Sequence, residues 1–432
     1  MKLVLKNIGM LKSAEITLNQ LTVIAGENDN GKSTVGKVVF CIIKAINRYK
    51  EDLQESKDYK IDDKLRELFF ILRRGSSNFT DDVESAFRRL RQRTYELLEE
   101  LSLSSVFESD ANELKALAGL KGTYELEFDE LCGDISRIAV SPEDEKKSIE
   151  SALNKVFASE FDSTVLYSGA KSGSIRLFEN KIKLLDIKVH HGNKFTLEGD
   201  IEPIQLKDAT FIESPLILNN HDLLIRSQSG LNLRRGNIAR LGVPYTTLHT
   251  KDLFDKLREP GLGALFLSEK EIEFRDKLER IISGKVDYDN SAKDFIYRRA
   301  GADLSIKNTA SGIKVFGILQ LLVINDFMSK NTILIFDEPE NHLHPKWQLK
   351  LADALVQFAK HGVYILVSSH SPYMIEALKR YADCKGLNNE NCFYLAENNV
   401  IEDQERLEDI FRILAEPFEV FRSMDAEKLK DE

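Results

Sequence analysis

Cysteines, prolines and long apolar runs are scarce in this chain of 432 residues, and the scarcity excludes several classes of protein. Its four cysteines form no CxxC pair, which is typical of free thiols in a reducing compartment and argues against structural zinc. Nine prolines, 42% apolar and 30% charged residues are ordinary for a soluble globular protein. The length suggests about two to four domains, so collagen-like, mini-protein and disordered classes are excluded.

Membrane segments and targeting signals are also missing from the sequence. No stretch approaches the roughly 18 uninterrupted apolar residues that a membrane-spanning helix needs. The first ten residues alternate apolar and polar positions, which is typical of a strand. A signal peptide would instead have a continuous hydrophobic segment after a positively charged start. We therefore expect a cytoplasmic protein that makes no membrane contact.

The charge balance favours no class of partner. The chain has 60 basic and 70 acidic residues, and the last 32 residues hold 5 basic and 11 acidic ones. That tail accounts for more than half of the net charge of −10, so the remaining 400 residues are nearly neutral. Overall charge thus neither proposes nor excludes nucleic acid, because a local basic strip can exist on a balanced body.

Short apolar runs alternate with helix signals along much of the chain. Pro345 can open a helix that Gly362 ends, and Ser371 with Pro372 can cap and open the next. The alternation predicts an α/β fold with a mostly parallel sheet whose strands are buried on both faces. The predicted apolar strands are residues 2–8, 21–25, 332–336, 363–367 and 392–395. Strand-like alternation also predicts strands at residues 174–178, 181–189 and 194–197.

Two segments interrupt this α/β core. Residues 51–160 are mainly helical and charged in pattern, with one apolar stripe, and residues 218–299 are mainly helical. We expect both to be insertions into a core made of residues 1–50, 161–217 and 300–400, followed by an acidic C-terminal tail, residues 401–432. The stripe consists of Val83, Phe87, Leu90 and Leu97.

Residues 26–33, GENDNGKS, fit the pattern GxxxxGK[ST], with a predicted strand before them and a predicted helix after them. Glycines at both ends let backbone N–H groups converge on phosphate oxygens, and the following helix presents its positive end. Lys32 adds a full charge, and Ser33 would give its hydroxyl to Mg²⁺. A chance match has a probability of about one percent. The predicted phosphate-binding residues are Gly26, Asn28, Asn30, Gly31, Lys32, Ser33 and Thr34.

A second candidate element is the run ILIFDEPE, an apolar strand that ends in acids. Asp337 at such a strand end can hold Mg²⁺, and Glu338 can polarise the attacking water. Without a phosphate loop, an acidic turn would be the better interpretation; with the loop, the catalytic one is favoured. His370 closes the next strand, where a neutral imidazole could hydrogen-bond the γ-phosphate or the water.

A third segment, residues 308–314, precedes an apolar helix pattern. Its Ser311, Gly312 and Lys314 could form a second phosphate cradle at a helix start, although an ordinary helix cap would explain them about as well.

Together, GENDNGKST, NTASGIK, ILIFDEPENHLHP and LVSSHSP resemble the ATPase head of ABC-type ATPases, in particular the bacterial branch with RecF, SMC and OLD-like proteins. The resemblance implies a P-loop NTPase fold that uses ATP and Mg²⁺, with residues 1–50, 161–217 and 300–400 as the head. In that family two heads enclose each ATP. Lys32 and Ser33 of one copy would meet Ser311 and Gly312 of a second, so a homodimer or higher homo-oligomer is implied, with residues 341–344 crossing between sites.

The sequence also departs from parts of this pattern. The signature is shorter than that of transporter heads, 279 residues separate Lys32 from Ser311, and no magnesium-contacting glutamine can be placed between residues 50 and 215. The long gap argues against a transporter's energy-coupling head. Only 62 residues follow His370, too few for the TOPRIM nuclease domain of OLD proteins. We therefore expect an AAA family ATPase without that domain, and any nuclease to be a separate protein.

Two arginine groups are candidates for nucleic-acid contact, since such strips can bind phosphates. Acids near the first group favour salt-bridged helix surfaces, whereas the second leaves both interpretations open. The paired histidines 190–191 and 342–344 are better explained as solvated strand residues and an interface loop than as metal ligands. The first group is Arg73, Arg74, Arg88, Arg89, Arg91 and Arg93; the second is Arg226, Arg234, Arg235 and Arg240.

The sequence therefore predicts a Mg²⁺-dependent ATPase in which ATP closes an assembly of heads and hydrolysis reopens it. By analogy with the family, the heads would sense or gate a separately encoded nuclease or toxin in bacterial anti-phage defence. The main alternative is a RecF-like repair or recombination ATPase that binds DNA. A non-hydrolysing scaffold is disfavoured by the presence of Glu338.

Overall fold

A computed structural model describes most of the chain, with gaps in the insertions and near the C-terminus. The chain divides into two compact units, which we call the core unit (Met1–Asn47 with Glu150–Glu432) and the helical unit (Arg48–Ile149). The described residues are 1–76, 80–99, 104–140, 145–162, 164–226, 228–229, 245–259, 269–402, 408–413, 416, 420–422 and 424.

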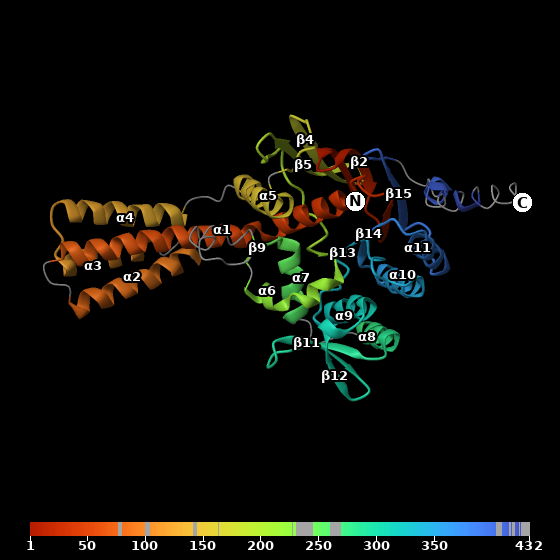
Figure 1. The fold of residues 1–432 in the computed structure, drawn as a ribbon. Helices are drawn as coiled ribbons and strands as arrows, with labels where there is room; N and C mark the ends of the chain where they lie inside the picture. The colour runs from red at the N-terminus through yellow and green to blue at the C-terminus, as the bar shows by residue number, and fades with distance from the viewer. Residues whose placement is uncertain are drawn as a thin grey trace, which may run out of the picture. The chain divides into compact units, whose positions relative to one another are not determined.

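An 11-stranded sheet lies at the centre of the core unit, with the strand order β6-β5-β4-β1-β2-β16-β15-β3-β14-β13-β7 (Figure 1). The strands from β15 to β7 pair in parallel, and those from β6 to β2 pair antiparallel. The strands are β1 (Lys2–Ile8), β2 (Leu11–Thr17), β3 (Leu21–Ala25), β4 (Ser172–Glu179), β5 (Ile182–His190), β6 (Lys194–Leu197), β7 (Asp208–Ile212), β13 (Thr332–Asp337), β14 (Tyr364–Ser369), β15 (Asn391–Glu397) and β16 (Val400–Ile401).

The parallel strands have the continuous apolar character that the sequence suggested. Every residue of β3 is buried, as are residues 332–336 of β13 and residues 365–369 of β14. Such strands need cover on both faces, which helices supply in α/β proteins. The predicted α/β fold, with a strand, a loop and a helix at the phosphate loop, is confirmed.

Helices of the core unit pack around this sheet, and those that follow β7 share one large apolar core with the parallel strands (Figure 1). The fourteen-residue α9 is buried along nearly its whole length, because it carries apolar side chains on all sides. The helices are α1 (Lys32–Gly75), which begins at the phosphate loop, α5 (Glu145–Phe161), α6 (His221–Arg226), α7 (Leu248–Arg258), α8 (Glu269–Ile282), α9 (Ser311–Ile324), α10 (Pro345–Lys360) and α11 (Pro372–Cys384).

The helix boundaries around the site follow the predicted signals. Pro345 is the first residue of α10, and Gly362, just beyond its end, has a φ of 95°. Pro372 is the first residue of α11, and the Ser371 hydroxyl accepts a hydrogen bond from the backbone N–H of Met374. These are the usual positions of proline, serine and glycine at helix ends.

Other elements were missed by the sequence patterns. The stretch between the first two predicted strands looked polar, but it contains β2, in which Leu11, Ala14 and Ile16 face the core. Antiparallel strands can be solvated on one face, so half of β2 is polar. In the segment expected to be largely helical, β10 (Lys285–Asp289) and β11 (Asp294–Arg299) form, and together with β12 (Ala302–Ser305), just beyond that segment, they make a three-stranded sheet. The short β8 (Gln228–Ser229) and β9 (Tyr245–Thr246) also pair there.

The helical unit contains the part of α1 from Arg48 onward, α2 (Asp81–Glu99), α3 (Ser104–Ala118), α4 (Thr123–Val140) and the start of α5. Its predicted apolar stripe, Val83, Phe87, Leu90 and Leu97, is buried in a separate apolar core. Nothing in the described helices is long and apolar enough to cross a membrane.

Four of the six arginines in the first group form ion pairs on the surface of the helical unit. Arg89 pairs with Glu113 at 2.8 Å, and Arg93 pairs with Asp110 at 3.2 Å. Arg88 and Arg91 also have carboxylate partners, Glu84 and Asp62. The salt-bridged interpretation therefore describes these four arginines. Of the second group, the side chain of Arg226 and all of Arg234, Arg235 and Arg240 lie outside the described residues.

Candidate functional site

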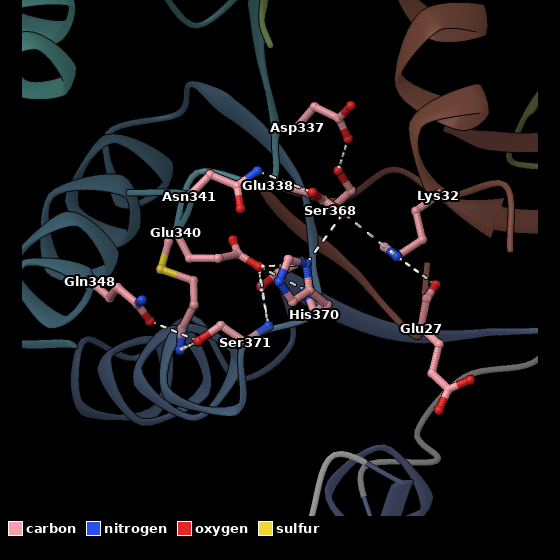
Figure 2. Close-up of polar contacts among 12 residues, drawn as sticks. Glu27, Lys32, Asp337, Glu338, Glu340, Asn341, Gln348, Ser368, His370 and Ser371 are labelled. Atoms are coloured by element: carbon pink, nitrogen blue, oxygen red, sulfur yellow. Dashed lines mark hydrogen bonds and ion pairs between the residues drawn. The ribbon is translucent and has the colours of Figure 1, made fainter. Parts of the chain in front are cut away.

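The candidate site lies where neighbouring parallel strands end. Strands β3, β14, β13 and β7 run in the same direction and are adjacent in that order. Because the carboxyl ends of parallel strands share one edge of the sheet, the residues that follow them come together. This edge collects the phosphate loop after β3, His370 after β14 and the acids at the end of β13 (Figure 2).

Glycine is required at both ends of the phosphate loop. Gly26 has a φ of 150° and Gly31 a φ of 81°, conformations that side chains with a Cβ rarely adopt. A Cβ on Gly26 would lie 2.5 Å from the backbone oxygen of Ala396, and one on Gly31 would lie 2.6 Å from Leu11 Cδ2. Residues of β15 and β2 therefore lie so close to the two ends of the loop that neither position has space for a side chain.

The polar residues within the loop have different surroundings. Asn28 is exposed, whereas Asn30 accepts a hydrogen bond from the backbone N–H of Asn399 at 3.4 Å. Thr34 is buried, and its Oγ1 accepts a hydrogen bond from the backbone N–H of Met10 at 3.4 Å. The Thr34 hydroxyl thus faces the β1–β2 turn, so a phosphate contact from Thr34 would come from its backbone.

Lys32 is nearly buried at the start of α1, with 4% of its side chain exposed. Its Nζ donates a hydrogen bond to the Glu27 backbone oxygen at 2.7 Å and lies 3.9 Å from Glu338 Oε1 (Figure 2). Burial lowers the pKa of Lys32, and nearby carboxylates, first Glu338 and then Asp337, partly oppose that shift. A phosphate bound in the loop would place further negative charge beside the buried Lys32 ammonium and stabilise its charged form, so the loop suits an anion.

Ser33 and Asp337 place two oxygen atoms side by side. The Ser33 hydroxyl donates to Asp337 Oδ1 at 2.9 Å, and the Ser368 hydroxyl donates to the same oxygen. Burial raises the pKa of Asp337, and the two hydroxyls act in the opposite direction. A cation near this carboxylate would favour its charged form.

This pair of oxygens fits magnesium. Mg²⁺ prefers oxygen ligands and usually takes only one or two from protein, with water and substrate phosphates completing its shell. The described ranges contain no group of three or more histidine, cysteine or acidic side chains that could hold a metal ion.

Glu338 occupies a strained position directly after Asp337. Its φ of 47° lies in the left-handed region, which is uncommon for a residue with a side chain and tends to occur at functional sites. Glu338 Oε1 lies 3.3 Å from His370 Nδ1, and Oε2 accepts a hydrogen bond from the Asn341 amide at 3.1 Å (Figure 2). The structure therefore brings Lys32 close to Glu338, which follows it by more than 300 residues in the sequence and lies beside His370.

Sequence reasoning assigned no role to Glu340, which organises the turn between β14 and α11. Its buried Oε1 accepts hydrogen bonds from the Ser369 hydroxyl at 2.7 Å and from the backbone N–H groups of His370 and Ser371 at 2.8 and 3.1 Å. The Ser371 hydroxyl in turn donates to Gln348 Oε1 on α10 at 2.7 Å (Figure 2). Glu340 thus fixes His370 beside Glu338.

Replacing Glu340 with alanine should lower the free energy of unfolding by about 2 to 4 kcal/mol, since buried donors would lose their acceptor. Equilibrium unfolding in urea, monitored by circular dichroism, measures this change in the free energy of unfolding. Glu376→Ala, which removes a half-buried carboxylate on α11 that pairs with the exposed Arg380, should change stability by less than about 0.5 kcal/mol. Equal effects of the two replacements would show that Glu340 has no structural role at this turn.

Glu213 was also missed, because its place depends on strand pairing. It directly follows β7, whose last residue Ile212 pairs with Phe336 of β13, so Glu213 and Asp337 each lie one residue beyond that pair. The sequence predicted no residue here and left the position of a magnesium-contacting glutamine open. The residue at this edge is a glutamate, 53% exposed.

Ser311, Gly312 and Lys314 lie at the start of α9 and make contacts of a different kind. A Cβ on Gly312 would lie 2.7 Å from the Trp347 ring, so glycine permits close packing of α9 against α10. Lys314 Nζ donates to the Lys307 backbone oxygen at 3.3 Å, and burial lowers the pKa of Lys314. Ala310 is the N-cap of α9 and Ser311 its first helical residue. Their predicted contact with phosphate remains a prediction.

Comparison with known proteins supplies a family. A family profile described as AAA ATPase domain matches residues 1–375. No curated protein matches the chain. Among solved structures, an SMC head bound to the C-terminal winged-helix domain of ScpA is 13% identical over 95% of this chain and 99% of its own, with a TM-score of 0.40.

Two other solved structures are similar at the same low level. The SMC head domain from Thermotoga maritima is 12% identical over 93% of this chain and 96% of its own, with a TM-score of 0.35. The ADP conformation of MJ1267, an ATP-binding cassette of an ABC transporter, is 14% identical over 98% and 99%, with a TM-score of 0.34. Such values transfer no function to this chain.

Proposed function

This chain belongs to the AAA ATPase domain family, and on that premise we propose that it binds ATP with Mg²⁺ and hydrolyses it at the sheet edge described above. The observation that carries the proposal is the convergence of Ser33 on Asp337, at 2.9 Å, beside the cluster of Lys32, Glu338 and His370. A phosphate-binding lysine, a pair of magnesium-type oxygens and a candidate general base are the parts that phosphoryl transfer to water requires.

Each residue has a distinct part in the proposed reaction. Backbone N–H groups of residues 26–33 and the Lys32 ammonium bind the phosphates, while Ser33 and Asp337 hold Mg²⁺. Bound Mg²⁺ neutralises charge that develops on the phosphate oxygens. Glu338 accepts the proton of the attacking water. His370, fixed by Glu340, orients Glu338 or donates to the terminal phosphate.

We further propose that two copies enclose the nucleotide, with Ser311, Gly312 and Lys314 of one copy facing the phosphate loop of the other. This arrangement is supported by the resemblance of the four sequence segments to ABC-type heads. It also gives a role to the exposed residues Asn341 and His342 in the turn beside Glu338.

Replacing Ser311 with glutamate should abolish ATP-dependent dimerisation while ATP binding to the single copy persists, because a carboxylate would face the phosphates of the second copy. An acid in the first turn of α9 favours the helix, so the fold should be retained. Light scattering after size-exclusion chromatography measures the dimer. The only tryptophan, Trp347, packs on Gly312 and should change fluorescence when ATP closes the wild-type pair.

The matched control is Ser329→Glu, which adds the same charge at an exposed position before β13. It should dimerise with ATP as the wild type does. Normal ATP-dependent dimerisation of the Ser311→Glu variant would contradict the shared nucleotide site.

The biological role that we propose is gating of a separate effector, a nuclease or toxin, in bacterial anti-phage defence. Its support is the resemblance of the motifs to heads that control such partners. Affinity purification from native cells, with mass spectrometry of retained proteins, tests it: a copurifying effector that dissociates on ATP hydrolysis is expected. The alternative, a DNA-binding repair ATPase, receives no support from Arg88, Arg89, Arg91 and Arg93, which are ion-paired.

A further inference from the structure

His249, near the start of α7, connects two carboxylates of the core unit. Its Nδ1 lies 2.6 Å from Glu160 Oε2, and its Nε2 lies 3.2 Å from Glu213 Oε2. The other Glu160 oxygen accepts a hydrogen bond from the His249 backbone N–H at 2.8 Å. An ionised carboxylate only accepts hydrogen bonds, so both ring nitrogens donate and the imidazole is doubly protonated.

The surroundings of His249 support this charge. Only 3% of its side chain is exposed, and its ring packs 4.9 Å from Phe211 and 6.3 Å from Phe40, measured between ring centroids. Burial alone would lower the pKa of His249, but hydrogen bonds to Glu160 and Glu213 raise it to about 9. His249 is therefore a cation at neutral pH.

The two carboxylates contribute differently. The Glu160 side chain is fully buried and binds both the backbone and the ring of His249, which is enough to anchor the start of α7. Glu213 is 53% exposed, and an ion pair with an exposed partner adds little stability. The contact between His249 and Glu213 therefore matters mainly for the charge of Glu213. The hydrogen bond from His249 lowers the Glu213 pKa, and the charge of Lys37 makes a smaller contribution.

Glu213 adjoins the pair of oxygens that would hold Mg²⁺. Glu213 and Asp337 each follow the last paired residues, Ile212 and Phe336, of neighbouring strands whose backbones are about 4.8 Å apart. Carboxylates on two adjacent strand ends repel each other, and a cation between them would attract both. In the structure, part of the Glu213 charge is offset by His249 instead.

We propose that His249 sets the cation affinity of the nucleotide site by holding Glu213. When a cation binds, the Glu213 carboxylate leaves His249 and turns toward the cation. It then adds a third oxygen, directly or through water, to the pair formed by Ser33 and Asp337. His249 then keeps only Glu160, so the start of α7 and the end of α5 are linked to cation binding. This inference rests on the proposed function, because it needs a nucleotide-dependent cation site.

Binding of Mn²⁺, followed by electron paramagnetic resonance with a non-hydrolysable ATP analogue, tests the proposal without catalysis. Glu213→Gln should weaken Mn²⁺ binding about tenfold, equivalent to about 1.4 kcal/mol. His249→Gln should strengthen it about threefold, since it frees Glu213 and removes a positive charge. In the Glu213→Gln background, His249→Gln should have little further effect, because the two residues act through one contact.

Glu198→Gln is the matched control, since this exposed glutamate follows β6 at the opposite end of the sheet. It should bind Mn²⁺ as the wild type does. Wild-type affinity in Glu213→Gln, or unchanged or weaker binding in His249→Gln, would overturn the inference. If His249→Gln does not fold, Glu213→Gln decides alone, because it leaves Glu160 and His249 paired. Failure of the wild type to bind Mn²⁺ with nucleotide would instead reject the proposed function.

Discussion

Replacing Glu338 with glutamine is expected to slow ATP hydrolysis by about 10²- to 10⁴-fold, the usual loss when a general base is removed. Glutamine keeps the size of the side chain and an oxygen that can accept from Asn341, so the turn after β13 should be preserved. Binding of ATP should remain, because the phosphate loop and Lys32 are unchanged. Release of inorganic phosphate and equilibrium binding of ATP measure the two effects separately.

A variant that binds ATP without hydrolysing it should accumulate closed assemblies, since bound nucleotide stabilises the state that binds it. Size-exclusion chromatography with ATP should show this accumulation. Glu376→Gln, which alters a half-buried glutamate on α11 paired with Arg380, is the control and should hydrolyse ATP at the wild-type rate. Normal turnover by the Glu338→Gln variant would remove Glu338 from the role of general base.

Replacing Lys32 with alanine is expected to abolish measurable ATP binding, with a loss of about 100-fold or more. Hydrogen bonds to charged groups are worth about 1.5 to 3 kcal/mol, and 100-fold corresponds to about 2.7 kcal/mol. Lys32 is also nearly buried, so few water molecules can replace its charge. Isothermal titration calorimetry with ATP and Mg²⁺ measures the loss.

Lys188→Ala provides the control for Lys32→Ala. Lys188 is an exposed lysine on β5, in the antiparallel part of the sheet, and its removal should leave ATP affinity unchanged. Thermal unfolding of both variants would show whether the folds are intact. Wild-type affinity in a folded Lys32→Ala protein would refute the assignment of residues 26–33 as a phosphate loop.

The parts of the site that could be predicted from sequence are those whose functional residues lie next to one another in the chain. The loop glycines, Lys32 and Ser33 lie within eight residues, and their function depends on local backbone geometry that the residue types dictate. The strand before Asp337 and Glu338 is likewise visible as an apolar run. Parallel strands then require that both segments end at one edge of the sheet.

The residues that could not be predicted depend on contacts between distant segments. Glu213 reaches the site because β7 pairs with β13, whose residues lie more than 100 positions later in the chain. Glu340 looks like one more acid in an acidic turn until three donors from residues 369–371 surround it. His249 sits on an ordinary amphipathic helix, and only folding reveals its two carboxylates. Pairing of this kind leaves no periodic trace in the sequence.

The place of β15 in the sheet matters for anyone who shortens this protein. The family profile ends at residue 375, yet β15 lies between β3 and β16, and the Ala396 oxygen presses against Gly26. Asn399 donates hydrogen bonds to Asn30 and to the Asp29 backbone oxygen. A truncation at residue 375 would remove β15 and leave one edge of β3 without its hydrogen-bonding partner. It would also remove the residues that contact the phosphate loop from that side. Expression designs should therefore extend at least through Ile401.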